Sequence, residues 1–238
     1  MLIFARLGTV MGLLPAIGDK SILPRAKLSL GMTVSLVIYP MLEGGMPLYP
    51  ASAGVFAQLL IGEILIGLFL GLTVKIMFLA LSVVGLIISM QSGLGSAMFF
   101  DPSQKEQVPI FSRMIFLIAT MTIFVTDTHY VFLEGAIESY DKFPVGQMPD
   151  IGDMSNFISR SINDSFILAF KLVSPFLIVS IAILAGSGIL ARLMPNLQVF
   201  FVLTPVQILA MFITFFIVIH VMLDKLMVAL REAAMLQL

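Results

Sequence analysis

The sequence predicts an all-α, polytopic membrane protein of long, kinked helices, and three observations support this fold class. Of the 238 residues, 59% are hydrophobic and only 11% are charged, whereas soluble domains carry about 25% charged residues. The mean hydropathy is +1.09, and a core of this chain length cannot hide so much apolar surface. Four apolar runs reach the roughly 20 residues that a membrane-crossing helix needs, namely 55–90, 110–133, 165–190 and 197–223.

The N-terminal part of the chain contains two shorter apolar stretches. Residues 7–17 follow Arg6 like a signal peptide, but the next residues offer no small-x-small cleavage site. We therefore expect a short or partial first helix that belongs to the mature chain. The run 28–42 is marginal for crossing a bilayer. The segment 18–27 between them carries three basic residues, which favours the cytoplasmic side.

The run 55–90 is too long for one simple crossing, because its 36 residues would extend about 54 Å as a helix. It either folds back as a hairpin or stands well out of the bilayer among other proteins. Glu63, Gly67 and Gly71 recur every four residues in this run and share one helical face. Small residues at this spacing allow a second helix to approach closely. We expect a helix of a neighbouring subunit to cover this stripe, which the isolated chain would leave without a partner helix.

Glu63 also has a functional interpretation, because a carboxylate within a membrane helix is by default a candidate for ion or proton relay. The packing interpretation is favoured, since a polar group of a neighbouring subunit would satisfy Glu63. Lys75 and Arg192 are grouped with Glu63 as polar residues that interrupt apolar segments.

The chain between 134 and 164 is acidic and is expected to connect two helices on the extracytoplasmic face. Beyond it, Pro175 and Pro205 lie inside the last two apolar runs. Proline removes a backbone donor, so these two residues are predicted helix breaks. They are either packing kinks or irregular backbone that lines a cavity, as in transporters. The C-terminal residues 224–238 are amphipathic and are expected to leave the apolar slab.

The sequence offers little for catalysis or cofactor binding. It contains no cysteine and only two histidines, and Asp127 and His129 are two residues apart, a poor spacing for a metal pair on a helix. "AGSGIL" at 185–190 with His220 faintly resembles intramembrane serine proteases. No phosphate-binding loop and no basic run that would indicate nucleic acid are present. We expect no enzyme, no cofactor and no metal.

Several patterns together resemble one family. They are "PAIGDKSILPRAKLSLGMTVSLVIYP" (15–40), "GEILIGLFLGL" (62–72), "QSGLGSAMFFDP" (91–102), "DTHY" (127–130), "SYDKFPVG" (139–146) and "ILARLMPNLQVFFVLTPVQI" (189–208). Their order and content are similar to the FliR family of flagellar export-gate proteins, whose SctT counterpart serves type III secretion injectisomes. The resemblance extends over nearly the whole chain, 1–238, as a single membrane domain.

The resemblance implies a role in a helical protein-export gate at the flagellar basal body of the bacterial inner membrane. It implies FliP-like and FliQ-like subunits as partners, an FlhB-like export protein, the basal-body ring, membrane lipid and unfolded export substrates. It also implies that part of the gate stands above the membrane plane, which would explain the overlong run at 55–90.

The resemblance further implies that the loop 93–109 carries a plug for the central pore. Residues 93–100 suit this role, because Gly93 and Gly95 permit unusual backbone angles. Deformable apolar bulk comes from Met98, Phe99 and Phe100, and Asp101 ends the segment. An ordinary exposed turn, a self-contained secondary transporter that uses Glu63 or Asp127, and a scaffold without pore contact remain alternatives.

Overall fold

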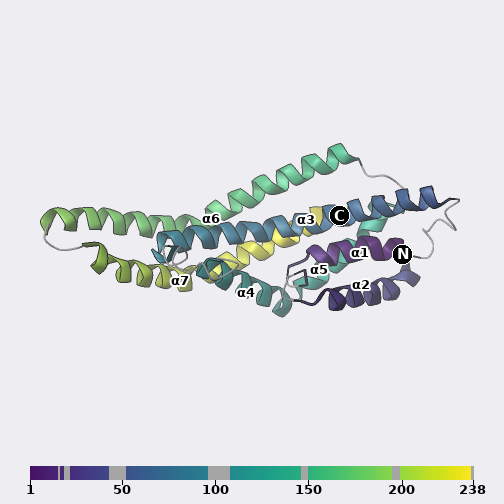
Figure 1. The fold of residues 1–238 in the computed structure, drawn as a ribbon. Coiled ribbons are helices and arrows are strands. Elements are labelled where there is room, and N and C mark those ends of the chain that lie inside the picture. The colour runs from purple at the N-terminus through teal and green to yellow at the C-terminus, as the bar shows by residue number, and fades with distance from the viewer. Residues whose placement is uncertain are drawn as a thin grey trace. The chain divides into compact units, whose positions relative to one another are not determined.

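The computed structural model is all-helical in the part of the chain that it describes. That part contains seven α-helices, one short 3-10 helix and no strand, as Figure 1 shows. The predicted fold class is thereby confirmed. The described residues are 1–15, 17–18, 22–42, 52–95, 108–145, 150–194 and 199–236.

The N-terminal segment forms a short helix, α1 (Leu2–Leu13), followed by α2 (Pro24–Ile38) and the 3-10 helix η1 (Tyr39–Met41). Helix α2 begins at a proline, whose fixed φ suits the first turn and whose missing donor costs nothing there. Helix α1 buries Arg6 together with the apolar residues Ile3, Leu7, Val10 and Met11. The sequence indicated the short first helix but no role for its arginine.

Helix α3 (Ala53–Gln91) runs unbroken for 39 residues. The hairpin alternative for the run 55–90 is therefore wrong. No proline interrupts this segment, so i to i−4 hydrogen bonds satisfy the backbone groups in its interior. In its most apolar 18-residue window, 67% of the residues are buried inside the chain, so protein covers much of this apolar helix.

The chain after 108 folds into α4 (Ile110–Val125), α5 (Thr128–Lys142), α6 (Ile151–Leu193) and α7 (Val199–Leu236). Between α4 and α5, Asp127 adopts a left-handed φ of 54°, a conformation that Asp tolerates better than most residues. The acidic segment 134–164 was expected to connect helices, yet most of it is helical. Exposed Glu134 and Glu138 share one face of α5 while Phe132 and Ala136 are buried, so the charges belong to an amphipathic helix.

The two predicted helix breaks do not end a helix. Pro175 lies inside α6 and Pro205 inside α7, and both helices continue through them. Pro175 cannot donate to the carbonyl of Lys171, four residues earlier. The hydroxyl of Ser174 donates to that carbonyl instead, at 2.9 Å. A local side chain thus compensates for the missing backbone donor and the helix persists.

The helices group into two compact units, and α3, α4, α6 and α7 contribute to both. Unit 1 comprises 1–78, 123–163 and 227–238, and unit 2 comprises 79–122 and 164–226. In unit 1, Phe69 of α3 packs edge-on against Phe157 of α6 at 5.3 Å. In unit 2, Phe111 of α4 packs against Phe212 and Phe215 of α7, with ring centroids at 4.9 and 5.6 Å.

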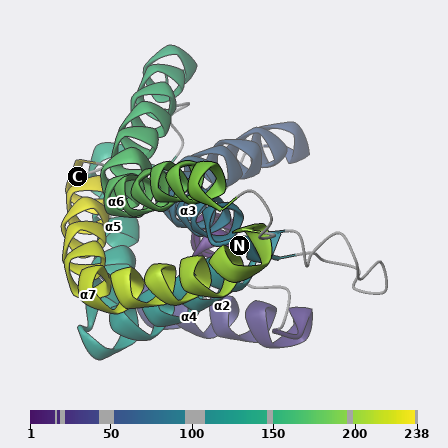
Figure 2. The same ribbon diagram turned by 90° about the vertical axis from the view of Figure 1, so that its left-hand side faces the viewer.

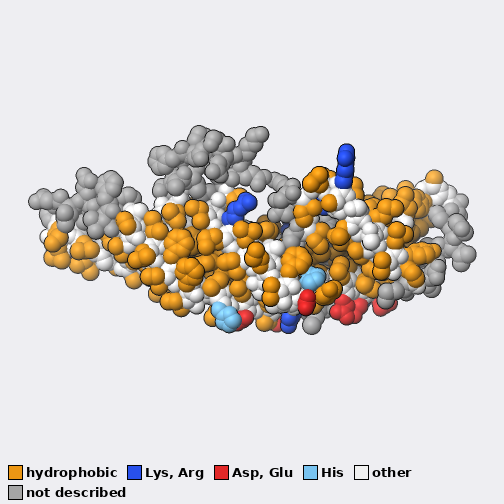
Figure 3. All heavy atoms as spheres, turned by 90° about the horizontal axis from the view of Figure 1, so that it is seen from below, with side chains coloured by type: hydrophobic (Ala, Val, Ile, Leu, Met, Phe, Trp, Pro, Cys, Tyr) orange, Lys and Arg blue, Asp and Glu red, His pale blue; other side chains and the backbone are white. Residues whose placement is uncertain are grey.

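Three of the described helices, α3, α6 and α7, are long and apolar enough to cross a membrane. A fourth candidate arises if α4 and α5 are counted together as one bent span. Hydrophobic side chains dominate the face drawn in Figure 3. These findings agree with a polytopic membrane protein.

Candidate functional site

The first candidate site is the base of the predicted plug loop 93–109, in unit 2. Helix α3 ends in a hydrogen-bonded turn, in which the amide of Ser92 donates to Ile88 O at 2.8 Å and that of Gly93 to Met90 O at 3.2 Å. Gly93 has a φ of 79°, the left-handed conformation that glycine adopts just after many helices. A residue with a Cβ is disfavoured at this position because of the backbone angle alone.

Gln91, the last residue of α3, connects this turn to two other helices. Its side-chain Oε1 accepts a hydrogen bond from Ser180 of α6, and its carbonyl accepts one from the Gln207 amide of α7. Ser180 is buried, and α6 and α7 are both strongly apolar helices, so an unpaired polar group there would be costly. The start of the loop is therefore held against both helices.

The other end of the loop is held against α3. The amide of Phe111 donates to Ser89 Oγ at 3.3 Å, and the Ser112 hydroxyl donates to Ser82 O at 3.0 Å. Any Cβ on Gly85 would collide with the backbone of Ser112, so glycine is required for this close approach. We call Ser89, Gln91, Phe111, Ser112, Ser180 and Gln207 the loop base.

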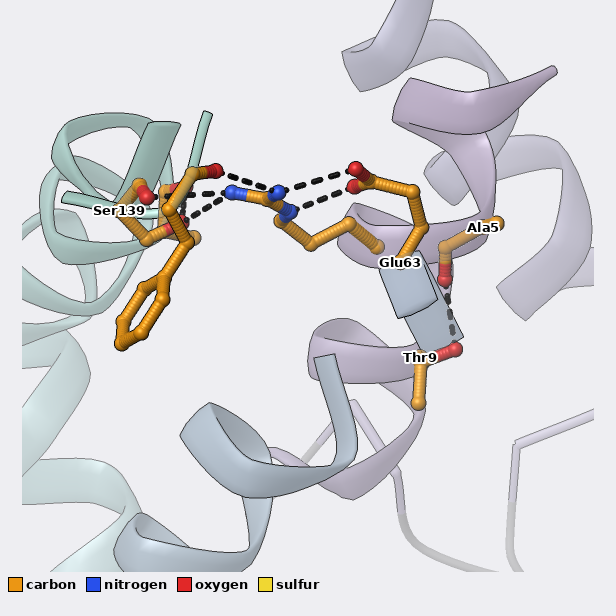
Figure 4. Close-up of polar contacts among 7 residues, drawn as sticks. Ala5, Thr9, Glu63 and Ser139 are labelled. Atoms are coloured by element: carbon orange, nitrogen blue, oxygen red, sulfur yellow. Dashed lines mark hydrogen bonds and ion pairs between the residues drawn. The ribbon is translucent and has the colours of Figure 1, made fainter. Parts of the chain in front are cut away.

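The second candidate site is a buried polar cluster around Arg6 in unit 1 (Figure 4). The guanidinium donates to both carboxylate oxygens of Glu63, with Nε–Oε2 at 2.6 Å and Nη2–Oε1 at 3.0 Å. It also donates to the carbonyl and hydroxyl of Ser139 at 3.1 and 3.2 Å and to the carbonyl of Phe143 at 2.8 Å. Arginine has five N–H donors, and these five bonds can use all of them.

Arg6 thereby joins three helices. The Ser139 and Phe143 carbonyls lie at the C-terminal end of α5, where a positive charge is favourable. The Ser139 carbonyl also accepts the Phe143 amide, at 2.9 Å. The Arg6 guanidinium also lies over the ring of Tyr140, 3.9 Å from its centroid. The Arg6 and Glu63 side chains are 0% and 2% exposed. Removing one member of such a pair strands a buried charge and costs about 3–5 kcal/mol.

The glycine stripe of α3 meets α1 of the same chain. A Cβ added at Gly67 would lie 2.6 Å from the Arg6 carbonyl oxygen, and one at Gly71 would lie 2.7 Å from Leu13 Cβ. The expected spacing for close helix packing is present, but the helix that covers the stripe is not in a neighbouring subunit. The covering helix is the 12-residue α1.

The remaining predicted residues lie apart from these two clusters. Lys75 and Arg192 are exposed on α3 and near the end of α6. Met98, Phe99, Phe100 and Asp101 lie outside the described residues. Ser187 of the protease-like motif donates to Leu184 O at 2.6 Å, and exposed His220 lies 3.4 Å from Asp224.

Sequence reasoning missed Arg6, Ser139, Gln91, Ser180 and Gln207 as site residues. Gln91 and Gln207 did carry a signal, because an amide side chain is unusual at the edge of or within a long apolar run. Arg6 carried one too, as a charge beside an apolar segment without a cleavage site.

Comparison with known proteins places these features in context. A family model described as bacterial export proteins, family 1, matches residues 1–233. The chain is 28% identical over 208 residues to the flagellar biosynthetic protein FliR of Caulobacter vibrioides, covering 87% of this chain and 83% of that protein. It is 27% identical over 219 residues to FliR of Bacillus subtilis, covering 90% and 83%. It is 25% identical over 195 residues to FliR of Escherichia coli K12, covering 82% and 74%.

Proposed function

Because the chain belongs to the bacterial export proteins, family 1, we propose that it is a membrane subunit of the flagellar protein-export apparatus. The observation that carries this proposal is the family match over residues 1–233, together with relatives that are named as flagellar biosynthetic proteins. The family resemblance inferred from the sequence is thereby confirmed. The export role rests on this membership and on three described helices that are long and apolar enough to cross a membrane.

We further propose that the chain helps to form the export gate and to plug its channel through residues 93–109. The loop base supports this role, because it holds both ends of the segment while Gly93 turns the chain sharply out of α3. A plug loop must be fixed at both ends while its middle blocks the pore reversibly. Apolar side chains such as Met98, Phe99 and Phe100 suit the middle, since hydrophobic attraction is non-directional and a passing substrate can replace their contacts with the pore.

The proposed partners are FliP-like and FliQ-like gate subunits, an FlhB-like export protein, the basal-body ring and unfolded export substrates, in the bacterial inner membrane. The flagellar role is preferred to the injectisome role because the relatives compared carry flagellar names. A self-contained transporter that relays ions through Glu63 is disfavoured, since Arg6 occupies both of its carboxylate oxygens.

The export role is tested by deleting the gene and restoring it. Loss of motility and of secreted flagellar proteins, both recovered with the intact chain, is the expected result. The chain should also co-purify with FliP-like and FliQ-like subunits from mild detergent. A deletion strain that still secretes flagellar proteins normally would refute the role.

The plug is tested separately by replacing Met98, Phe99 and Phe100 with serine. We expect assembly to remain intact while the membrane becomes leaky to ions or small solutes, because serine leaves the pore unfilled. Changing Ser103 and Gln104 to alanine in the same loop is the matched control and should not cause leakage. A complete complex that stays tight after the triple change would show that this stretch is not the plug.

A further inference from the structure

Helix α3, blue in Figure 2, is covered in unit 1 by three other helices of the chain. Helix α1 approaches it at Gly67 and Gly71, and α6 contacts Phe69 through Phe157. On a further side, Leu70 lines a small apolar cavity together with residues of α1 and α5. Since successive residues of a helix are turned by about 100°, these contacts cover most of the circumference of α3 and leave one side open.

The open side carries large side chains at helical spacing. Residues 61, 64, 65, 68, 72 and 75 fall within an arc of about 100°. Five of them are exposed, and Leu72 is half-buried. We call this set the open face of α3: Ile61, Ile64, Leu65, Leu68, Leu72 and Lys75.

Lys75 is the single charged residue of the open face. Its side chain is exposed, and the ion pairs among the described residues join Arg6 to Glu63 and His220 to Asp224. The ammonium of Lys75 therefore has no carboxylate partner in the described part of the chain. It lies about 33 and 24 Å from the two ends of α3.

Lipid alone covers this side of α3 poorly. The helix extends about 58 Å, nearly twice the hydrocarbon core of about 30 Å. If Lys75 lies within that core, an unpaired ammonium faces acyl chains, which is costly. If Lys75 lies at its boundary, the ammonium can reach the headgroups, but one half of α3 then leaves the hydrocarbon. The exposed leucines of that half, such as Leu68 or Leu79, would face water.

We propose that the open face of α3 is a docking surface for an apolar helix of another subunit, and that an Asp or Glu of that helix pairs with Lys75. Such a helix removes both conflicts, because its apolar side chains cover the leucines and its carboxylate compensates for the ammonium. A single charge pair within an apolar contact also fixes how far one helix is shifted along the other.

A second copy of this chain does not fit the surface. In a two-fold contact the open face would meet itself, and none of its six residues is acidic. The partner is therefore a different chain. The proposal rests on the proposed function only in that the partner is sought in the assembled export apparatus.

The docking is tested by photocross-linking in cells that hold the assembled complex. With benzoylphenylalanine in place of Leu68, we expect a discrete adduct with another protein. Mass spectrometry should map it to an apolar segment that has an Asp or Glu within one helical turn. The same group in place of Ile66, which is 1% exposed, is the control and should give no adduct between chains. Lipid adducts alone, an adduct between two copies of this chain, or a mapped segment without a carboxylate would overturn the proposal.

The role of Lys75 is tested by the yield of the adduct at position 68. Lys75→Arg keeps the charge and should keep the yield, whereas Lys75→Met should lower it several-fold. Lys75→Glu should lower the yield by about ten-fold or more, because two like charges would meet. Lys225→Glu makes the same charge change at an exposed position of α7 and should leave the yield unchanged. Equal yields for Lys75→Glu and Lys75→Arg would overturn the proposal.

Exchange of the two charges distinguishes pairing from general damage to the chain. In cells with Lys75→Glu, changing the mapped carboxylate of the partner to lysine should restore the adduct, and failure to restore it would contradict the pair. The thermal midpoint of the purified Lys75→Met chain should equal that of the wild type, because Lys75 has no ion pair among the described residues. Normal secretion after deletion of the gene would refute the export role but would leave the adduct and its charge dependence unchanged.

Discussion

Gly67→Ala should loosen the contact between α1 and α3. The added Cβ would lie 2.6 Å from the Arg6 carbonyl oxygen and 3.0 Å from Thr9 Cβ. Ordinary contact begins at 3.4 Å, so α1 must retreat by the difference, about 0.8 Å. The same retreat would lengthen the 2.6 Å bond between Arg6 and Glu63 toward about 3.4 Å, beyond the usual limit of about 3.2 Å for an N–H···O bond.

The magnitude follows from comparison with Gly62→Ala on the same helix. Both changes gain about 1 kcal/mol of helix propensity, but a Cβ at Gly62 has nothing within 4 Å. Overpacking costs about 1–3 kcal/mol, so Gly67→Ala should be less stable than Gly62→Ala by that amount. In a chain of this length the difference corresponds to a midpoint lower by about 2–12 °C.

The assay is thermal unfolding of the full-length variants in mild detergent, followed by circular dichroism. Gly62→Ala should match or exceed the wild-type midpoint. Equal midpoints for the two variants would refute the close approach of α1 to α3, because the steric difference between the two sites is the only reason for them to differ.

Two further predictions concern the buried pair and the end of α3. Arg6→Met or Glu63→Leu alone should each lower the free energy of unfolding, measured by denaturant titration, by about 3–5 kcal/mol. The double variant should lose clearly less than the sum of the two single losses. Additive losses would mean that the two side chains are not coupled. Gly93→Ala should destabilise the chain by about 1–2 kcal/mol, because Gly93 has a left-handed φ. Gly186→Ala is the control and should not destabilise the chain, because a Cβ at Gly186 meets open space. Identical thermal unfolding midpoints for the two variants would contradict the turn geometry.

Helix content and membrane class were predictable because both depend on local properties. The long apolar runs, their breakers and the four-residue spacing of Glu63, Gly67 and Gly71 can be read directly from neighbouring positions. The prediction that the charged segment 134–164 connects two helices was wrong, because its polarity alone does not distinguish a loop from an amphipathic helix. The helical spacing that places Glu134 and Glu138 opposite Phe132 and Ala136 is what indicates a helix.

Pairing between distant segments was not predictable from one sequence. Arg6 bonds to Glu63 and Ser139 across 57 and 133 positions, and Gln91 joins Ser180 and Gln207 across 89 and 116. Several helices offered a small-residue face or a polar side chain. Which of them meet depends on how all the helices pack, and no local pattern encodes that choice.

The sequence by itself determined that this chain is helical and suited to a membrane, because backbone hydrogen bonds within a helix and the transfer of apolar side chains out of water are set residue by residue. Only the tertiary structure decided that α1 covers the glycine stripe, that Glu63 is neutralised by Arg6, and that α6 and α7 hold the last turn of α3. A buried charge or amide is stable only beside its partner, and that partner is supplied by the fold.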